Sequence, residues 1–162
     1  MNKNMVFIEQ WAVFSKYWEH VRRTCKTVEV KNIAEVLSQE AIDQIIDYAM
    51  PRLKECFRNA YRIAEIGGYE YVEGLVNVCG LPIDHAWNKT KDGRYFDATF
   101  DLLGLEPGEE YTSLYEGTWD DISRLSLQSR VYGGYPNQLF LNSLETNSAC
   151  AGIFMAVDKK DI

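Results

Sequence analysis

The chain has 162 residues, of which 46% are hydrophobic and 13% are aromatic. This length and composition predict one folded domain with its own core and exclude a disordered polyanion. The formal net charge of −7 argues against the clustered lysines and arginines that bind a phosphate backbone, so we expect no nucleic-acid partner.

Helical periodicity marks the first part of the chain. Apolar residues recur at helical spacing over residues 7–21 and again over residues 33–48, and Ser38 is expected to divide the second pattern. We therefore expect N-terminal helices over about residues 7–49, packed against the centre of the domain. Glu9 and Gln10 interrupt the apolar run near the N-terminus, which lacks the core of a signal peptide.

The sequence also indicates a compartment. No stretch approaches the roughly twenty apolar residues of a membrane span. The four cysteines are irregularly spaced, and none forms a Cys-x-x-Cys pair. This pattern favours a reducing cytoplasm over a disulfide framework, so we expect a cytoplasmic protein without a membrane partner.

A third helical pattern ends at the pair Gly67-Gly68, and two starts fit it. A helix that begins at Cys56 places this thiol beside unpaired N–H groups and the positive end of the helix dipole, which favour a thiolate and can bind an oxyanion. A helix that begins at Pro51 fits as well, and it gives the thiol less of this help.

Three strand patterns follow, over residues 69–78, 83–88 and 94–100. The loop between the last two contains an Asp-Gly pair, which is typical of a hairpin. A five-residue loop pairs His85 with Asp97 on one face of this hairpin. A two-residue turn at Asp92-Gly93 pairs His85 with Phe100 instead. Either register gives a mainly antiparallel sheet and an α+β fold.

The last part of the chain is predicted to be an irregular connection followed by a helix and strands. Glycines and prolines between residues 103 and 118 predict the connection, and Thr118 is a capping residue for a helix over residues 120–130. A turn rich in tyrosine and glycine follows at residues 132–136. We expect this C-terminal part, about residues 118–157, to complete a single domain over residues 1–162.

Cys56, His85 and Asp97 supply one candidate for each role in a nucleophilic triad, in that order along the chain. A thiol is a nucleophile as its thiolate, an imidazole accepts the thiol proton near neutral pH, and a carboxylate orients the imidazole. The three residues predict a Cys-His-Asp acyl-transfer site.

The short motifs around these residues resemble the core of the transglutaminase-like superfamily, within the wider papain-like cysteine fold. A cysteine at a helix start, a His-Ala-Trp strand and an Asp-x-Thr strand carry the resemblance, over about residues 51–101. Four segments are similar to a group of small bacterial and phage proteins: residues 56–60, 71–74, 81–87 and 92–99. The resemblance implies a papain-like core, with helices on a mainly antiparallel sheet, and the triad above.

The stretch before Cys56 departs from the family pattern. Lys54 and Glu55 stand where these enzymes often carry an aromatic or small residue and a glycine. No glutamine stands a few residues before Cys56, where papain-like enzymes have an oxyanion donor, so Asn59, one helical turn later, or backbone N–H groups would have to serve.

Other candidate residues have simpler structural interpretations beside the functional ones. Trp87 lies on the same strand face as His85, where it either walls a substrate site or fills the core. His20 is expected to be structural or at the surface. Asp97 could instead cap a turn, with Asp101 as a substitute carboxylate.

The remaining cysteines are expected to be small core residues: Cys25, Cys79 and Cys150. A zinc site would have to combine Cys56, Cys79 and His85, whose long spacing is unlike that of metal-ligand pairs. We therefore expect no metal and no cofactor.

These features together predict a cysteine enzyme that transfers an acyl group from an amide or thioester, as a hydrolase, protease, deamidase or transglutaminase-like enzyme acting on a peptide or protein. Water or an amine can accept the acyl group, and the sequence leaves both acceptors and the oligomeric state open. A second hypothesis is a noncatalytic, acidic binding module that keeps the cysteine-hydrolase fold. Glu55 and Asp84, which adjoin Cys56 and His85 in the sequence, favour this alternative.

Overall fold

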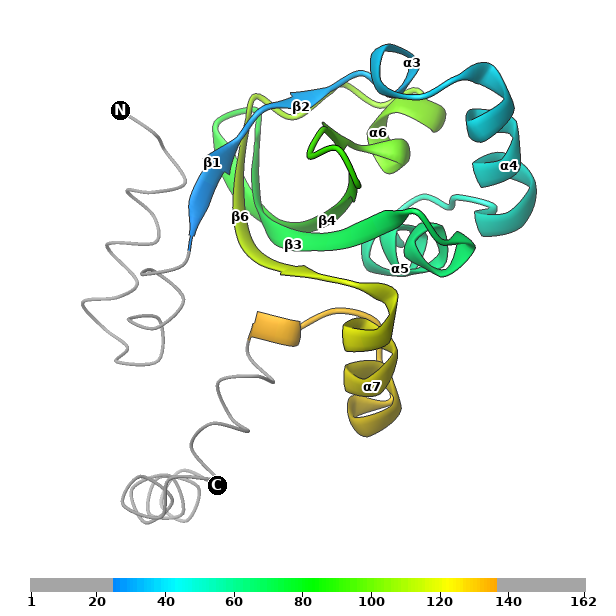
Figure 1. Cartoon of the computed structure of the whole chain (residues 1–162). Coiled ribbons are helices and arrows are strands. Elements are labelled where there is room, and N and C mark those ends of the chain that lie inside the picture. The colour runs from blue at the N-terminus through cyan, green and yellow to red at the C-terminus, as the bar shows by residue number, and fades with distance from the viewer. Residues whose placement is uncertain (1–24, 137–162) are drawn as a thin grey trace, which may run out of the picture.

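The computed structural model describes residues 25–136, which build a six-stranded sheet with helices packed against it (Figure 1). The strands lie in the order β1-β6-β3-β4-β5-β2, and all neighbours are antiparallel except β2 and β5. The first two strands are β1, Lys26–Val28, and β2, Val30–Lys31. The predicted α+β class with a mainly antiparallel sheet is confirmed. The helix expected over residues 7–21 and the elements expected after residue 136 lie outside the described residues.

The helices before the centre of the chain follow the predicted pattern. Helix α3 spans Ile33–Val36, α4 spans Gln39–Ala49, and the break between them falls at Ser38, as expected. The Ser38 hydroxyl accepts a hydrogen bond from the Ala41 N–H at 3.3 Å. This serine therefore divides the apolar pattern by capping the second helix.

Helix α5, Cys56–Ile66, begins at the candidate nucleophile and not at Pro51. Glu55 occupies its N-cap position and makes no capping hydrogen bond with its side chain. The Glu55 side chain thus leaves the first-turn N–H groups of α5 uncapped. Unpaired N–H groups beside the thiol are what the sequence predicted for a helix that begins at Cys56.

Strands β3, Tyr69–Val78, and β4, Leu81–Thr90, form a long hairpin at the centre of the sheet. β3 has its predicted bounds, and β4 extends beyond the predicted residues 83–88 at both ends. In their register Gly74 lies opposite His85. A Cβ at Gly74 would lie 2.0 Å from the Thr112 carbonyl oxygen, so only glycine lets β6 pass this closely.

The strand predicted over residues 94–100 is wrong. β5 covers only Tyr95–Phe96, and helix α6, Ala98–Leu102, follows at once. The pairs between β4 and β5 are Asn88 with Phe96 and Lys89 with Tyr95. Neither register expected for His85 occurs, because the chain leaves the sheet first. The cause is Asp97, whose carboxylate accepts hydrogen bonds from first-turn N–H groups of α6 and so starts a helix.

The irregular connection predicted over residues 103–118 is wrong in its second half. Strand β6, Glu110–Gly117, pairs with β3 on one side and with β1 on the other. Its apolar and small polar residues do not alternate, because Tyr111 through Leu114 are all buried. A strand that is covered on both faces lacks the alternation that would identify it in the sequence.

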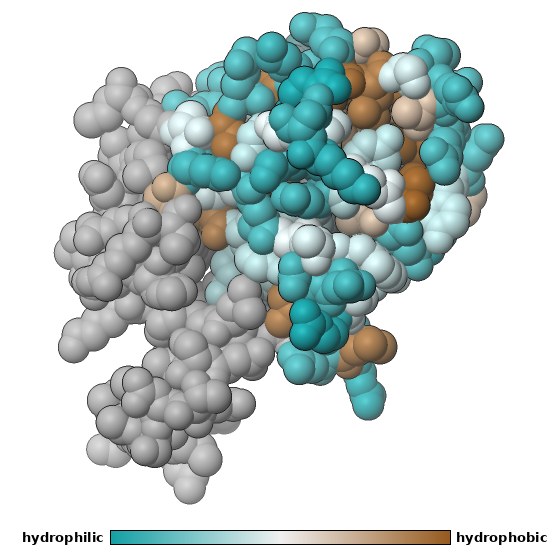
Figure 2. All heavy atoms as spheres, viewed as in Figure 1, coloured by the Kyte–Doolittle hydropathy of each residue, from teal (hydrophilic) through white to brown (hydrophobic). Residues whose placement is uncertain are grey.

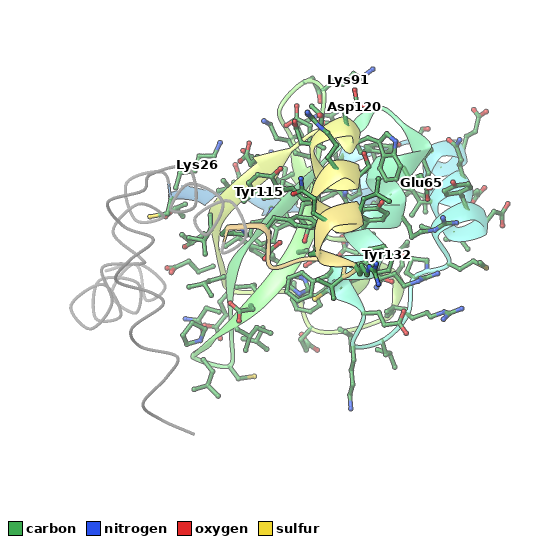
Figure 3. All side chains as sticks on the ribbon, turned by 90° about the horizontal axis from the view of Figure 1, so that it is seen from below. Lys26, Glu65, Lys91, Tyr115, Asp120 and Tyr132 are labelled. Carbon is green, nitrogen blue, oxygen red and sulfur yellow. The ribbon has the colours of Figure 1, made fainter. Side chains whose placement is uncertain are left out.

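Helix α7, Trp119–Ser129, confirms the predicted C-terminal helix to within one residue at each end. Thr118 caps it, and Asp121 completes a capping box with the Thr118 backbone. The helix lies across the sheet, with Asp120 at one end and Tyr132 just beyond the other (Figure 3).

Apolar side chains gather in three clusters around α5 and the sheet. The first joins α3, α4 and α5, and the second joins α5 and α7 to one face of the β3–β4 hairpin. The third lies on the opposite face, against α6, and consists of Val72, Val76, Trp87, Phe100 and Tyr111. Much of the visible surface over these layers is hydrophilic (Figure 2). Helix α5, which begins at Cys56, is thus packed into two of the three clusters.

Candidate active site

A buried histidine and a buried carboxylate meet beside the β4–β5 connection. Nε2 of His85 lies 2.7 Å from Oδ2 of Asp97. Each of the two side chains is 3% exposed. His85 comes from β4, and Asp97 is the residue before α6. The structure therefore brings together the two residues that the sequence singled out, although by neither of the expected registers.

The Asp97 carboxylate binds with both oxygens. Oδ1 accepts hydrogen bonds from the backbone N–H groups of Thr99 at 3.0 Å and Phe100 at 3.2 Å. Oδ2 accepts one from the Tyr111 hydroxyl at 2.9 Å, in addition to its contact with His85. The sequence offered capping and triad membership as alternatives. Asp97 does both, and the cap fixes the carboxylate to which His85 binds.

Aromatic rings hold the plane of the imidazole. The Phe100 ring lies 4.5 Å from that of His85 at an angle of 22°, and the Trp87 ring lies 6.3 Å away at 18°. Trp87 is 1% exposed, so it packs as a core aromatic beside the histidine and does not wall an open site. Stacked on these rings, His85 has little freedom to rotate away from Asp97.

Cys56 completes the group from the first position of α5, where it is partly buried. Its thiol is close enough to His85 for hydrogen bonding and charge interaction with the ring. Since Asp97 occupies Nε2, Nδ1 is the ring nitrogen left for the thiol. The three predicted triad residues thus converge, with the imidazole between the sulfur and the carboxylate.

The imidazole holds its proton tightly. Burial lowers the pKa of His85, but the charge and hydrogen bond of Asp97, together with the interaction with Cys56, outweigh burial and raise this pKa to about 10. The ring is therefore protonated at neutral pH, and its charge adjoins the candidate nucleophile. An imidazolium in this place stabilises a thiolate and can protonate a leaving group.

The side chain of Asn59 is fully buried and is committed to structure. Its Oδ1 accepts a hydrogen bond from the Arg52 N–H at 3.0 Å. Its Nδ2 donates to the Arg52 carbonyl at 2.8 Å and to the Thr99 hydroxyl at 3.1 Å. Both N–H groups are thus in use, and Asn59 ties the segment before Cys56 to α6. Asn59 therefore has no N–H group left for the oxyanion role considered for it.

Asp101 does not replace Asp97. Its carboxylate accepts hydrogen bonds from the Ile33 N–H at 2.7 Å and from the Asn32 side chain at 3.2 Å. These bonds anchor the start of α3 against α6.

Two other cysteines lie within the described residues, and they differ in exposure. Cys25 is half-buried, whereas Cys79 is exposed in the β3–β4 turn, so its expected place in the core is wrong. Cys79 has a φ of 50°, in the left-handed region that is typical of tight turns. His20 and Cys150 lie outside the described residues.

A pocket of about 250 Å³ opens next to the nucleophile's neighbour, Phe57. Its lining combines apolar side chains with two carboxylates and two glycines: Phe57, Leu114, Pro136, Glu73, Asp84, Gly74 and Gly134. Phe57 follows Cys56 in α5, and Gly74 pairs with His85 in the hairpin, so the lining includes a direct neighbour of each of these two triad residues.

Sequence reasoning missed Glu73, which is buried on β3. Its carboxylate accepts hydrogen bonds from the Tyr71 hydroxyl at 2.8 Å, the Gly134 N–H at 2.8 Å and the Tyr135 N–H at 3.3 Å. Burial raises the pKa of Glu73 to about 7, although these bonds favour the charged form. An acid between Val72 and Gly74, within a mostly apolar strand, was the available signal.

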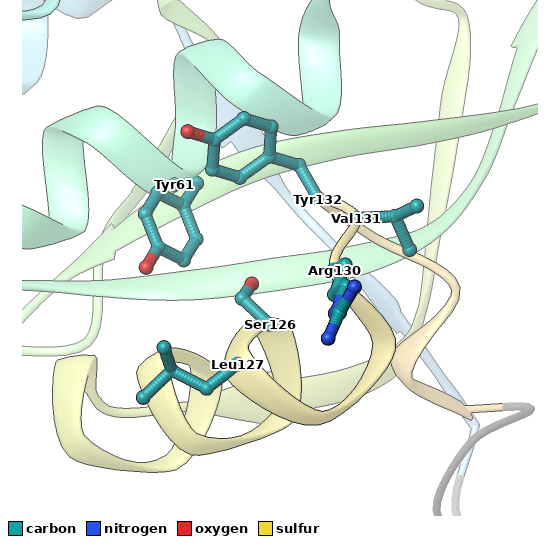
Figure 4. A pocket seen from close by; sticks show the side chains of 6 residues that line it. All are labelled: Tyr61, Ser126, Leu127, Arg130, Val131 and Tyr132. Atoms are coloured by element: carbon teal, nitrogen blue, oxygen red, sulfur yellow. The ribbon is translucent and has the colours of Figure 1, made fainter.

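A second pocket of about 250 Å³ lies between α5 and the end of α7 and contains none of the candidate triad residues (Figure 4). Among residues 25–136, no group of three or more His, Cys, Asp or Glu side chains is placed to hold a metal ion. In the same part of the chain, no helix has both the length and the apolar character needed to cross a membrane.

Comparisons with protein-family models, with curated proteins and with solved structures find no match for this chain. The function has therefore to be inferred from the residues of the site themselves.

Proposed function

We propose that this chain is a cysteine-nucleophile acyl-transfer enzyme on a papain-like, transglutaminase-like core, with Cys56, His85 and Asp97 as its triad. The observation that carries the proposal is the buried imidazole of His85, which Asp97 holds through Nε2 at 2.7 Å and which interacts with the Cys56 thiol. A structural cysteine has no need of a stacked, charged imidazole beside it.

The proposed reaction begins with an amide or thioester carbonyl beside Cys56. The thiolate attacks the carbonyl carbon, a C–S bond forms, and the carbonyl electrons move to oxygen. The His85 imidazolium then donates its proton to the leaving amine or thiol as the bond to that group breaks. Water or an amine next attacks the acyl-enzyme, His85 takes its proton, and the C–S bond breaks to release Cys56.

Backbone N–H groups at the start of α5 are the proposed oxyanion donors. Glu55 provides no side-chain cap for this turn, and the Asn59 side chain spends its donors on Arg52 and Thr99. The positive end of the α5 dipole adds to the stabilisation of negative charge at Cys56.

The substrate is proposed to be a peptide or protein that enters the pocket beside Phe57. This pocket offers apolar walls at Leu114 and Pro136 and an exposed glycine, Gly134, which suits an extended chain. Cys56 and Cys79 are free thiols, which fits a reducing cytoplasm.

The pH dependence of Cys56 alkylation tests the proposal. Iodoacetamide labelling is followed by peptide mass spectrometry in wild type and in His85→Ala. We expect Cys56 to react at pH 6 at least about tenfold faster than the exposed Cys79, which serves as the internal control, and to lose this advantage in His85→Ala.

If Cys56 is labelled no faster than Cys79 in wild type, the proposal of a cysteine enzyme is contradicted. That result would favour the noncatalytic binding module, whose fold needs no thiolate. A fast Cys56 that is unaffected by His85→Ala would equally contradict the triad, because the helix dipole alone would then account for the reactivity.

A further inference from the structure

A tyrosine shares the carboxylate oxygen that holds the candidate catalytic histidine. The hydroxyl of Tyr111, on β6, lies 2.9 Å from Oδ2 of Asp97, and Nε2 of His85 lies 2.7 Å from the same atom. A carboxylate only accepts hydrogen bonds, so the hydroxyl donates. Two donors thus compete for the charge on one oxygen.

Tyr111 is itself held firmly in this position. It is 5% exposed, and its ring packs edge-on against Trp87 with 5.1 Å between centroids. A backbone hydrogen bond from Gly108 reaches its hydroxyl, and a Cβ at Gly108 would lie 2.9 Å from its ring. Burial and the adjacent charge of Asp97 raise the pKa of Tyr111 far above its ordinary value, so it stays a neutral donor.

We propose that Tyr111 is a positioning residue of the site, which fixes the Asp97 carboxylate and draws part of its negative charge away from His85. This inference rests on the proposed function, in which His85 has both to hold a proton beside Cys56 and to release it to a leaving group. A carboxylate that gave its whole charge to the imidazole would hold that proton too tightly for transfer. The hydrogen bond from Tyr111 therefore weakens the attraction between the Asp97 carboxylate and the His85 imidazolium.

The groups that face this ion pair come from several elements. The titratable ones are Cys56 on α5, Asp101 on α6 and Tyr111 on β6, and Lys31 on β2 lines a pocket together with Asp97. β4 and α6 otherwise present the rings of Trp87 and Phe100, which do not titrate. Tyr111→Phe removes one hydrogen bond from Oδ2 of Asp97 and leaves every charge in place, so it isolates the proposed effect.

An NMR titration of the His85 ring tests the role of Tyr111. The chain has two histidines, so in a His20→Gln background the only histidine ring signals are those of His85. We expect Tyr111→Phe to raise the midpoint of this titration by about half a pH unit to one unit, because Asp97 then gives more of its charge to the ring.

Tyr95→Phe is the matched control. The Tyr95 hydroxyl also donates to a carboxylate, Oε1 of Glu116, at 2.8 Å, but outside the triad. This variant is expected to leave the His85 midpoint unchanged. An equal midpoint in wild type and Tyr111→Phe, or an equal rise in both variants, would overturn the proposal.

Incorporation of 3-fluorotyrosine at position 111 gives a second arm that keeps the ring and its packing. Fluorine makes the phenol a stronger donor, so we expect the His85 midpoint to fall, opposite to the change in Tyr111→Phe. A change in the same direction, or none, would overturn the proposal. Slow alkylation of Cys56 in wild type would refute the proposed function without deciding the His85 titration, so the two failures are distinguishable.

Discussion

Glu73→Gln is predicted to remove part of the pH dependence of folding stability. The pKa of the Glu73 carboxyl is raised from 4.5 to about 7 in the folded chain, chiefly by burial. The folded state therefore binds this proton more tightly than the unfolded state between these values. Stability contributed by Glu73 is fully present below pH 4.5 and is lost as the pH rises through about 7.

The size of the effect follows from the same two values. At about 1.4 kcal/mol for each pH unit, the difference corresponds to about 3 kcal/mol of unfolding free energy. Glutamine carries no charge and removes this dependence. It also leaves one of the donors at Tyr71, Gly134 or Tyr135 poorly matched, which costs about 1–3 kcal/mol at every pH. The prediction therefore concerns how the stability difference between variant and wild type changes with pH, and not its constant part.

Urea unfolding between pH 4.5 and 8 measures this slope. We expect the stability of Glu73→Gln relative to wild type to rise by about 3 kcal/mol across the range. Glu116→Gln is the control, because burial raises the pKa of Glu116 but hydrogen bonds from Lys26, Lys89 and Tyr95 outweigh it and lower this pKa to about 2. Its contribution is complete above pH 4.5, so its difference from wild type stays flat. A flat difference for Glu73→Gln as well would refute the reasoning.

Two further experiments test how the surroundings of Cys56 are supported. Asn59→Ala is expected to destabilise the chain by about 3 kcal/mol in urea unfolding, because it leaves the part-buried backbone groups of Arg52 and the buried Thr99 hydroxyl without their partner. A loss below about 1 kcal/mol would contradict that account. Gly133→Ala is expected to cost more stability than Gly134→Ala, since both positions have positive φ but only the first would place a Cβ 2.5 Å from Phe57; equal losses would show that this contact yields freely.

The helices of this fold are largely visible in the sequence, for local reasons. Ser38 and Thr118 cap the helices that they were expected to cap, and the apolar spacing of α4 and α5 matches the faces that they bury. Capping and periodicity depend on neighbours within a few positions, so sequence patterns report them well.

The strands were harder to predict where burial, and not alternation, decides their composition. β6 was expected to be irregular, although it lies between β1 and β3 with both faces covered. This error also concealed Tyr111, since a residue in an irregular loop gives no reason to place it against Asp97. Likewise, the backbone N–H groups that bind the Glu73 carboxylate come from Gly134 and Tyr135, 61 and 62 positions along the chain. No local sequence pattern reports a contact over that separation.

The most informative error concerns Asp97, which the sequence presented as either a cap or a triad member. That choice assumed that one carboxylate has one partner. The two oxygens point to different partners, because Oδ1 accepts from α6 while Oδ2 faces His85 and Tyr111. Ending the strand at Asp97 is thus what turns Oδ2 toward the imidazole, and the expected hairpin register was unnecessary. A carboxylate that caps a helix is held in place, because the backbone N–H groups that it binds cannot move without unwinding the helix. The local rule that stops β5 therefore also fixes the carboxylate on which the proposed chemistry depends.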